Sequence, residues 1–514
     1  MKHERSKKVS ANRSAQAKQW VLSGRALHDQ GRYIEALANY DKAIACNPYE
    51  ASAFNNRANA FLLLERHEEA LANIERAITL NPAAFGNHFN RANMLRNCGR
   101  YEEALAPFRT AIALKPDFLP AYINLGELLH DLQRFEQALA CYDRALQIEP
   151  SNLSALNGRG KALHVLGQVE KAEAAFDQAL TLDQSYKFAH FNKGIVKLSH
   201  GQYEEGWRLY EWRKQVFPRS AKSPGAESHA PDGTNRWDGG TFVGKRLLIC
   251  HEQGLGDTLQ FVRYAALCKA RGGQVIVQCR PPLQNLLRSC PGVDNVLIDA
   301  GANDFDIWIE MMSLPHLLGT TMETIPNAVP YLRADDASMA KWAPQLHRDH
   351  RLKVGLVWAG ESHEDHTARL IDRRRSMHLR QLLPLLEIQG LRFVSLQLGK
   401  PAAQIDELGL RVQIEDFTPA IADYMDTAAI IEQLDLVIAV DTSVVHAAGA
   451  LGKPVWILSR FDACWRWLQN QETNPWYPTA RVFGQATAGD WDTVTQRVAA
   501  ELRKLLRDDA GPDT

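Results

Sequence analysis

The residues best suited to chemistry follow a short apolar run, Leu436 to Val440, whose length and composition predict a strand buried on both faces. Directly after it come three polar residues that can cap a helix: Asp441, Thr442 and Ser443. The helix is predicted from Val444 to Leu451. Its first N–H groups and its dipole would bind a phosphate or pyrophosphate, with His446 one turn in and facing that ligand. The alternative is an ordinary strand–helix unit in which His446 is a core or surface residue.

A second candidate lies in the turn that follows a predicted strand beginning at Arg246. The turn carries Gly254, Gly256 and then Asp257. This spacing differs from the G-x-G-x-x-G fingerprint and disfavours a dinucleotide oxidoreductase. A carboxylate at this helix N-terminus could accept a proton from an incoming hydroxyl, so Asp257 is a candidate general base. The alternative role is helix capping.

Two sets of alternating strands and helices must position these residues. The first set begins at Arg246 and the second at Lys353. Such alternation predicts parallel, doubly wound sheets, so we expect two Rossmann-like domains, at residues 245–345 and 346–508. Ligands should collect at the carboxyl ends of the strands, between the two halves.

The first 218 residues follow a different pattern, a 34-residue period marked by recurring prolines: Pro48, Pro82, Pro116, Pro150 and Pro218. Small residues and large residues recur with the same period, which resembles the tetratricopeptide repeat. We expect an all-α superhelix of six repeats over residues 17–218. A polar, basic tail (1–16) precedes it, and a linker rich in Pro, Gly and Ser (219–244) follows it.

One position of the repeat carries asparagine in four copies: Asn56, Asn90, Asn124 and Asn192. Gly158 interrupts this row. Because a side-chain amide both donates and accepts, a ladder of them could hold a peptide backbone on the concave face without reading its sequence. The ladder resembles the repeat region of O-linked N-acetylglucosamine transferase. The alternative is that these asparagines only cap or fill the inner helix surface.

Five motifs in order, EQGLGDTLQFVRY, VGLVWAG, DRRRS, DTSVVHAAGALGKP and NPWYP, resemble heptosyltransferase-like glycosyltransferases (family 9-type) of the GT-B fold. The layout is similar to bacterial repeat proteins that glycosylate flagellin and other proteins. The resemblance implies that Asp257 is the catalytic base. It implies donor contacts by Asp441, Thr442 and His446, with Ser443 in the same turn, and a cationic loop at Arg373, Arg374 and Arg375. It also implies metal-independent chemistry with a nucleotide-sugar as substrate and no resident cofactor.

Several other residues have weaker claims. Gln397 and Trp358 follow predicted strands and could touch the donor, although Trp358 could equally be core. A late aromatic cluster is expected to anchor the fold: Trp465, Arg466, Trp467, Trp476 and Tyr477. The sequence HEDH at 363–366 is expected to be a solvated loop, and the Asp304-x-Asp306 pair needs no metal.

Composition excludes several functional classes. Lys and Arg number 59 against 60 acidic residues, and this balance disfavours a nucleic-acid or anionic-membrane binder. The eight cysteines contain no Cys-x-x-Cys pair, so neither a disulfide framework nor a zinc site is expected. No apolar run is long enough to span a membrane, and the first twenty residues contain no secretory signal. We therefore expect a cytoplasmic protein.

Together these patterns predict a glycosyltransferase that moves a sugar from a nucleotide-sugar to a Ser or Thr of a protein held by the repeats. ADP-heptose, UDP-N-acetylhexosamine and CMP-nonulosonate all remain open as donors, and flagellin is an acceptor only by analogy. Two alternatives remain. One is a repeat scaffold with an inactive transferase domain, and the other is a GT-B sugar-nucleotide epimerase or hydrolase.

Overall fold

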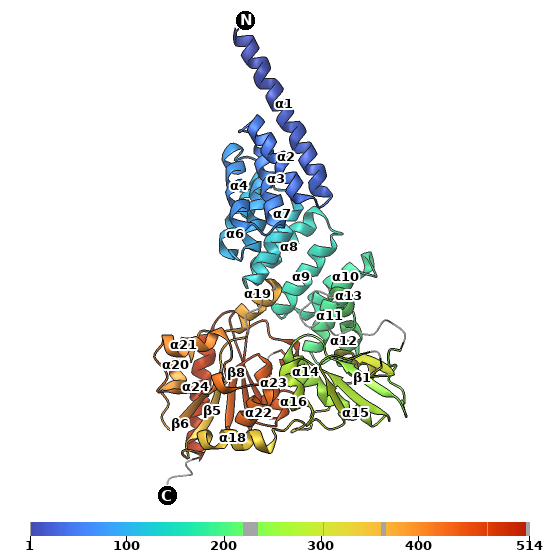
Figure 1. The fold of residues 1–514 in the computed structure, drawn as a ribbon, viewed down its shortest axis with the longest axis vertical. Coiled ribbons are helices and arrows are strands. Elements are labelled where there is room, and N and C mark those ends of the chain that lie inside the picture. The colour runs from blue at the N-terminus through green and yellow to red at the C-terminus, as the bar shows by residue number, and fades with distance from the viewer. Residues whose placement is uncertain (1, 219–234, 302, 361–365, 470, 510–514) are drawn as a thin grey trace. The chain divides into compact units, whose positions relative to one another are not determined.

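The structure is a computed structural model that describes residues 2–218, 235–301, 303–360, 366–469 and 471–509 (Figure 1). The chain divides into two compact units, Met1–Gln184 and Ser185–Thr514. The first is all-helical and the second contains both parallel sheets. Each unit is described here by itself.

The first unit consists of consecutive antiparallel helix pairs. Their bounds are α1 (Lys2–Asp29), α2 (Tyr33–Cys46), α3 (Ala51–Leu63), α4 (His67–Leu80), α5 (Phe85–Asn97), α6 (Tyr101–Leu114), α7 (Leu119–Asp131), α8 (Phe135–Ile148), α9 (Leu153–Val165) and α10 (Val169–Leu182). The segment predicted as a polar tail is therefore helical, since α1 begins at Lys2.

The 34-residue period is visible in the packing. One position of the repeat carries an alanine that is fully buried where two helices cross: Ala36, Ala70, Ala104, Ala138 and Ala172. Four positions later a large residue fills the space beside each alanine: Tyr40, Ile74, Phe108, Tyr142 and Phe176. Each turn between the paired helices needs a residue with positive φ. Gly31, Gly99 and Gly167 supply it, whereas Glu65 and Gln133 adopt φ of 60° at the same position of the repeats that have no glycine there. The all-α tetratricopeptide superhelix predicted from the sequence is confirmed.

The second unit begins with one more helix pair, α11 (Lys187–Ser199) and α12 (Tyr203–Tyr210), followed by the short α13 (Arg213–Val216). This pair is built into the core of the α/β region. Trp207 is 1% exposed and meets Trp465 edge to face, with ring centroids 5.1 Å apart. The indole Nε1 of Trp476 donates to the hydroxyl of Tyr203 at 3.0 Å. The last helix pair thus shares one hydrophobic core with the sheets.

The first sheet has four parallel strands in the order β3-β2-β1-β4. The strands are β1 (Arg246–Cys250), β2 (Gln274–Gln278), β3 (Asn295–Leu297) and β4 (Ile307–Glu310). The connecting helices are α14 (Leu255–Phe261), η1 (Val262–Tyr264), α15 (Ala265–Lys269), η2 (Pro281–Leu283) and α16 (Gln284–Leu287); η3 (Met311–Ser313) and α17 (Leu314–Leu317) follow β4.

The second sheet has six parallel strands in the order β10-β9-β8-β5-β6-β7. The strands are β5 (Leu352–Val357), β6 (Leu391–Ser395), β7 (Ile414–Asp416), β8 (Leu436–Val440), β9 (Val455–Ser459) and β10 (Ala480–Gly484). Its helices include α18 (Asp336–Leu346), α19 (His366–Arg375), α20 (Leu383–Leu386), α21 (Gln404–Glu407), α22 (Tyr424–Glu432), α23 (Ser443–Ala450) and α24 (Trp491–Asp509), with the short η4 (Leu379–Leu382), η5 (Lys400–Ala403), η6 (Thr418–Ala420) and η7 (Trp465–Trp467).

Both strand orders follow the doubly wound arrangement, in which the chain reverses direction across the sheet at one point. That point lies between β1 and β4 in the first sheet and between β5 and β8 in the second. The expectation of an α/β region with parallel sheets is confirmed. The carboxyl ends of these strands are therefore the place to look for a ligand site.

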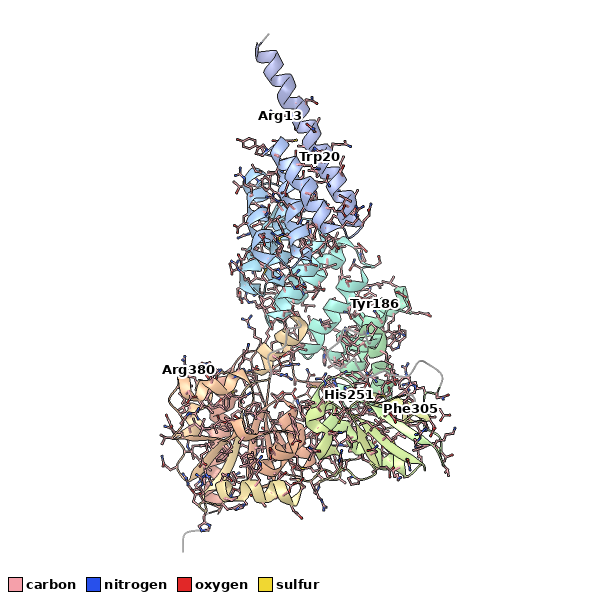
Figure 2. All side chains as sticks on the ribbon, viewed as in Figure 1. Arg13, Trp20, Tyr186, His251, Phe305 and Arg380 are labelled. Atoms are coloured by element: carbon pink, nitrogen blue, oxygen red, sulfur yellow. The ribbon has the colours of Figure 1, made fainter. Side chains whose placement is uncertain are left out.

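Side chains fill the space on both faces of the sheets, with Phe305 labelled beside the four-stranded sheet in Figure 2. Most of the predicted linker, residues 219–234, lies outside the described residues. Trp237 at its end is 4% exposed and donates its backbone N–H to Trp308 at 2.8 Å. All eight cysteines are unpaired. None of the described helices combines the length and the apolar composition that crossing a bilayer requires.

Candidate active site

The first part of the site is the turn between β1 and α14. Gly254 is the N-cap of α14, and its backbone N–H donates to Oδ2 of Asp257 at 2.8 Å. The other carboxylate oxygen, Oδ1, forms an ion pair with Arg466. Gln253, just before the turn, has a φ of 58° and donates its side-chain amide to Tyr210 at 3.1 Å. The capping role of Asp257 is thus real, and an arginine contact that the sequence did not suggest accompanies it.

The second part is the turn between β8 and α23. Thr442 is the N-cap, yet its side chain makes no capping bond, and its buried Oγ1 has no hydrogen-bond partner among the described residues. The hydroxyl of Ser443 instead bonds the hydroxyl of Tyr424. Thr442 is therefore the N-cap residue, as the sequence predicted, but neither its side chain nor that of Ser443 makes a capping bond. The N–H of Val445 donates to the carbonyl of Thr442 at 3.1 Å, so the N–H groups of Ser443 and Val444 are the donors that a phosphate would meet.

The two turns meet because of Gly256. A Cβ at this position would lie 2.7 Å from Cδ2 of His446 and 3.3 Å from Cα of Ser443. Only a residue without a side chain lets α14 approach α23 so closely. Asp257 and His446, 189 positions apart in the sequence, therefore belong to one contact between the two helices rather than to separate surfaces.

His446 is held firmly at this contact. Its Nδ1 lies 3.0 Å from the hydroxyl of Tyr477, and its ring stacks on Trp467 with centroids 5.4 Å apart. Burial, together with the nearby charges of Arg466 and Arg263, lowers the pKa of His446 well below its ordinary value. The imidazole is therefore neutral at neutral pH, so it can offer one donor and one acceptor.

Arg466 is the central cation of the site, and the sequence suggested for it only a place in an aromatic anchor. Its Nε donates to Oε1 of Gln260 at 2.6 Å, and its guanidinium lies over the ring of Trp465, 4.3 Å from the centroid. Burial works to lower its pKa, but Cys464 and Asp257 outweigh burial, and the net effect raises the pKa. The sequence did offer one signal for this role, a single arginine between two tryptophans. If the tryptophans are buried, the guanidinium is buried with them and needs an acid or several acceptors.

The three adjacent arginines lie at the end of α19, so the prediction of a loop here was wrong. Arg374 pairs with Asp462 at 2.9 Å. Arg375 pairs with Asp372 and donates to the backbone oxygen of Asp441 at 3.3 Å. Arg373 is exposed. As expected from their spacing, the three do not face one point.

A further arginine, Arg460, joins this cationic group at the carboxyl ends of β5, β8 and β9, and Gly360 lies beside it. Arg460, not suggested by the sequence, lies 3.2 Å from Asp462. Burial acts to lower the pKa of Arg460, whereas Asp462 and Asp441 raise it more strongly. Gly360 makes room, since a Cβ there would lie 2.7 Å from Nε of Arg375. The group can neutralise an anion that sits at the N-terminus of α23.

The side chain of Gln397 forms hydrogen bonds within the protein. Its Oε1 accepts from the backbone N–H groups of Trp358 (3.0 Å) and Ala359 (2.8 Å), and its Nε2 donates to Leu398 at 2.9 Å. These bonds tie the end of β5 to the end of β6, and the side chain is 2% exposed. Trp358 is fully buried. These bonds give Gln397 a structural role, and its predicted donor contact stays a prediction.

Three members of the asparagine row are hydrogen-bonded to asparagines outside the row. Asn90 donates to Asn55 at 2.8 Å, and Asn124 donates to Asn93 at 2.9 Å, in each case to the preceding repeat. Asn56 accepts from Asn55 at 3.3 Å. Asn192 lies on α11 of the second unit and is half-buried, as are the other three. The amides that were predicted to hold a peptide thus also link neighbouring repeats to each other.

The remaining candidates are structural. The four aromatic residues of the late cluster are all less than 9% exposed and pack in the core, as the expectation of an anchor requires. Asp306 accepts from the backbone N–H of Arg246 at 2.7 Å and pairs with its guanidinium at 3.1 Å. The HEDH segment, residues 363–366, lies outside the described residues except for the backbone of His366. Within the described parts of the chain, no three His, Cys, Asp or Glu residues lie together as a metal site would require.

Comparison with protein families identifies the repeats. Residues 51–83, 120–152 and 153–186 match "Tetratricopeptide repeat", and residues 24–65 and 92–133 match "TPR repeat". The helical part of the chain therefore consists of tetratricopeptide repeats, which in general bind peptides or proteins on their concave face. These matches cover none of the α/β region.

One curated relative, Protein FlbA of Caulobacter vibrioides, is 29% identical over 343 residues. The match takes in 61% of this chain and 54% of that protein, so the chain spans about half the length of the relative. Among solved structures, YrrB, described as a TPR protein with an unusual peptide-binding site, is 21% identical (TM-score 0.31, 34% of this chain, 90% of that one). PilF of Pseudomonas aeruginosa is 17% identical (TM-score 0.37, 41% and 95%). Likeness at these TM-scores is too low to transfer any binding property.

Proposed function

We propose that the α/β region is a glycosyltransferase of the GT-B architecture, which moves a sugar from a nucleotide-sugar to a Ser or Thr hydroxyl of a polypeptide. The observation that carries the proposal is the approach of α14 to α23 at Gly256. The residue before Asp257 packs against the first turn of α23, whose N-terminus suits a diphosphate, and this contact supports a shared site. A transferase needs both groups at one point.

The donor would sit at the carboxyl ends of β5 and β8, on the sheet with the arginine group. Departure of a nucleotide leaves negative charge on phosphate oxygens. The first amides of α23 and the guanidinium of Arg375, which already touches the Asp441 backbone, are placed to stabilise that charge. Neutral His446 can add one hydrogen bond without adding charge.

Asp257 would take the proton of the acceptor hydroxyl as the oxygen attacks the anomeric carbon. Its pairing with Arg466 fixes the orientation of the carboxylate, which favours a base in a single displacement with inversion. Both oxygens of the carboxylate already have a partner. The acceptor must therefore approach on a lone pair that neither Arg466 nor the Gly254 N–H occupies.

The polypeptide acceptor follows from the repeats, whose general property is to bind extended chains. Flagellin is one acceptor that this layout suggests by analogy. The repeats would raise the local concentration of the acceptor hydroxyl near Asp257, which is the usual benefit of linking a binding module to a catalytic one.

A scaffold without catalysis is the second candidate, and one observation favours it: both oxygens of Asp257 already have partners. Calorimetric titration with ADP-heptose, UDP-N-acetylhexosamine and CMP-nonulosonate separates the two, because a scaffold binds none of them. An epimerase or hydrolase would release an isomer or a free sugar without any protein present.

The decisive variant is Asp257→Asn. We expect it to abolish sugar transfer while donor affinity stays within about threefold, because the amide keeps the size of the side chain but cannot accept the proton. Mass spectrometry of protein acceptors measures the transfer. Asp306→Asn is the matched control, since Asp306 also pairs with an arginine and a backbone N–H but lies outside the site. Normal turnover by Asp257→Asn would remove this residue from the mechanism.

A further inference from the structure

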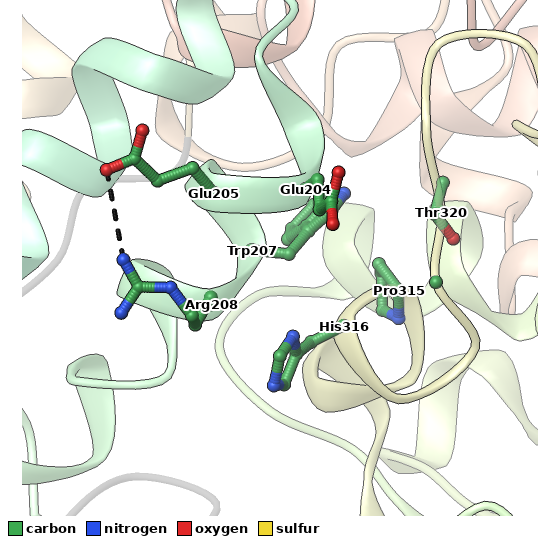
Figure 3. Close-up of a pocket in the computed structure, with 8 residues that line it drawn as sticks. Glu204, Glu205, Trp207, Arg208, Pro315, His316 and Thr320 are labelled. Carbon is green, nitrogen blue, oxygen red and sulfur yellow. Dashed lines mark ion pairs between the residues drawn. The ribbon is translucent and has the colours of Figure 1, made fainter.

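A cavity of about 390 Å³ lies within the second unit, where α12 faces α17 and the loop after it (Figure 3). It is lined by Glu204, Glu205, Trp207, Arg208, Pro315, His316, Gly319 and Thr320. None of these residues belongs to the candidate active site. The volume is at the lower end of the range for ligand pockets.

The charged side chains of the cavity are unequally engaged. Glu205 is shared between Arg208, 3.8 Å away, and Lys197, 3.4 Å away. Figure 3 marks the first of these pairs with a dashed line. Glu204, by contrast, forms no ion pair or hydrogen bond with any residue that the structure describes. The cavity therefore presents a carboxylate that a cation can pair with.

A second observation points independently to a ligand. Trp207 lines the cavity and is 1% exposed, and its indole Nε1 has no hydrogen-bond partner in the described parts of the chain. A buried donor without an acceptor is costly, and such groups usually have a partner. Thr320 does not serve, because its hydroxyl bonds Tyr264 at 2.8 Å.

We infer that this cavity binds a polypeptide segment through a lysine or arginine side chain. The cation pairs with Glu204, and a carbonyl oxygen of the same segment accepts from the indole of Trp207. Glu204 is exposed and has no ion-pair partner among the described residues, whereas the Trp207 indole is a buried donor without an acceptor. A peptide supplies both a cation and a carbonyl acceptor within a few ångströms, which suits this pair. Phosphate-bearing ligands are disfavoured by the two carboxylates.

The location agrees with a peptide ligand. Glu204 lies in the first turn of α12, the second helix of the last repeat, and the repeats are the part of the chain that is expected to bind polypeptides. The inference does not depend on glycosyl transfer. A binding assay without any donor tests it, so its failure would leave the proposed function untouched.

Glu204 also has a plain structural explanation, which provides the control. The same first-turn position carries glutamate in four earlier repeats: Glu68, Glu102, Glu136 and Glu170. Each stabilises its helix N-terminus through the dipole. If that were the whole role of Glu204, then Glu204→Gln and Glu170→Gln would behave alike in every assay.

The test uses the full chain with 5-fluorotryptophan at its twelve tryptophans, observed by ¹⁹F NMR. Trp207→Phe identifies the Trp207 resonance. The probe is the peptide acetyl-Gly-Ser-Lys-Ser-Gly-amide, and its matched partner has norleucine in place of lysine. We expect the lysine peptide to shift the Trp207 resonance saturably, and the norleucine peptide to bind at least about tenfold more weakly.

The variants sharpen the result. Glu204→Gln should weaken binding of the lysine peptide about tenfold, whereas Glu170→Gln should change it less than twofold. Equal binding of the two peptides, equal effects of the two variants, or no saturable shift at Trp207 would each overturn the inference. If Glu204→Gln fails to fold, the comparison of the two peptides on the unaltered chain decides by itself.

Discussion

Replacement of Gly256 by alanine tests whether the close approach of two helices makes the site. The new Cβ would lie 2.7 Å from Cδ2 of His446, whereas ordinary contacts begin at 3.4 Å. The helices must therefore separate by about 0.7 Å, or the imidazole must leave its place against Trp467 and Tyr477. A shift of this size between a catalytic carboxylate and the donor site costs about 10- to 100-fold in rate.

The expected effect on stability is smaller. Overpacking costs ~1–3 kcal/mol, and the better helix propensity of alanine returns up to ~1 kcal/mol of it. We therefore expect a loss of about 1–2 kcal/mol in the free energy of unfolding. Gly86→Ala is the matched control, because Gly86 is also helical and its Cβ would meet nothing within 4 Å.

The assay is sugar transfer by both variants at saturating donor, alongside denaturant unfolding. A separate donor titration shows whether binding or turnover has changed. If Gly256→Ala is as active as the control Gly86→Ala and the unaltered chain, the contact between α14 and α23 does not position the reacting groups. The argument built on it would then fail.

Three other outcomes follow from buried contacts. Because the pKa of His446 is lowered in the folded state, the unfolded chain binds its proton first as pH falls. Stability should thus drop by up to ~1.4 kcal/mol per pH unit below about pH 6.5, and denaturant titrations should show this extra slope vanish in His446→Gln. Gln397→Ala leaves two buried N–H groups without their acceptor and should cost about 2–4 kcal/mol by the same measurement; an unchanged midpoint would contradict its bracing role. Gly158→Asn, which would complete the asparagine row, places a Cβ 2.4 Å from the Tyr142 ring. Calorimetry should therefore find the repeats destabilised by ~1–3 kcal/mol, and a gain in stability would count against that packing.

Periodicity and local pattern predicted much of the fold from the sequence alone. The 34-residue period reports on contacts inside each repeat and between neighbours, so it determines the packing of the first unit. The apolar run at Leu436–Val440 and the polar turn after it predicted β8 and α23 to within one residue. These features depend on residues close together in the chain.

The contacts that give the site its character depend on residues far apart, and the sequence did not reveal them. Asp257 and Arg466 are 209 positions apart, and nothing in either segment indicates the other. Gln397 lies at a strand end as a ligand contact would, but its acceptor is taken by the neighbouring strand connection. Likewise, α19 extends through the arginines, because a run of charged residues is compatible with either a helix or a loop.

The incorporation of α12 into the α/β core has a practical consequence for dissecting this protein. A fragment cut at the predicted linker would lose Trp207 and Tyr203, which would lay bare the aromatic faces of Trp465 and Trp476. It would also remove Arg213, which lies 2.8 Å from Glu252, and leave that carboxylate without its arginine partner. We therefore expect an α/β fragment that begins near Ser185, and so keeps the final helix pair, to fold better than one that begins in the linker.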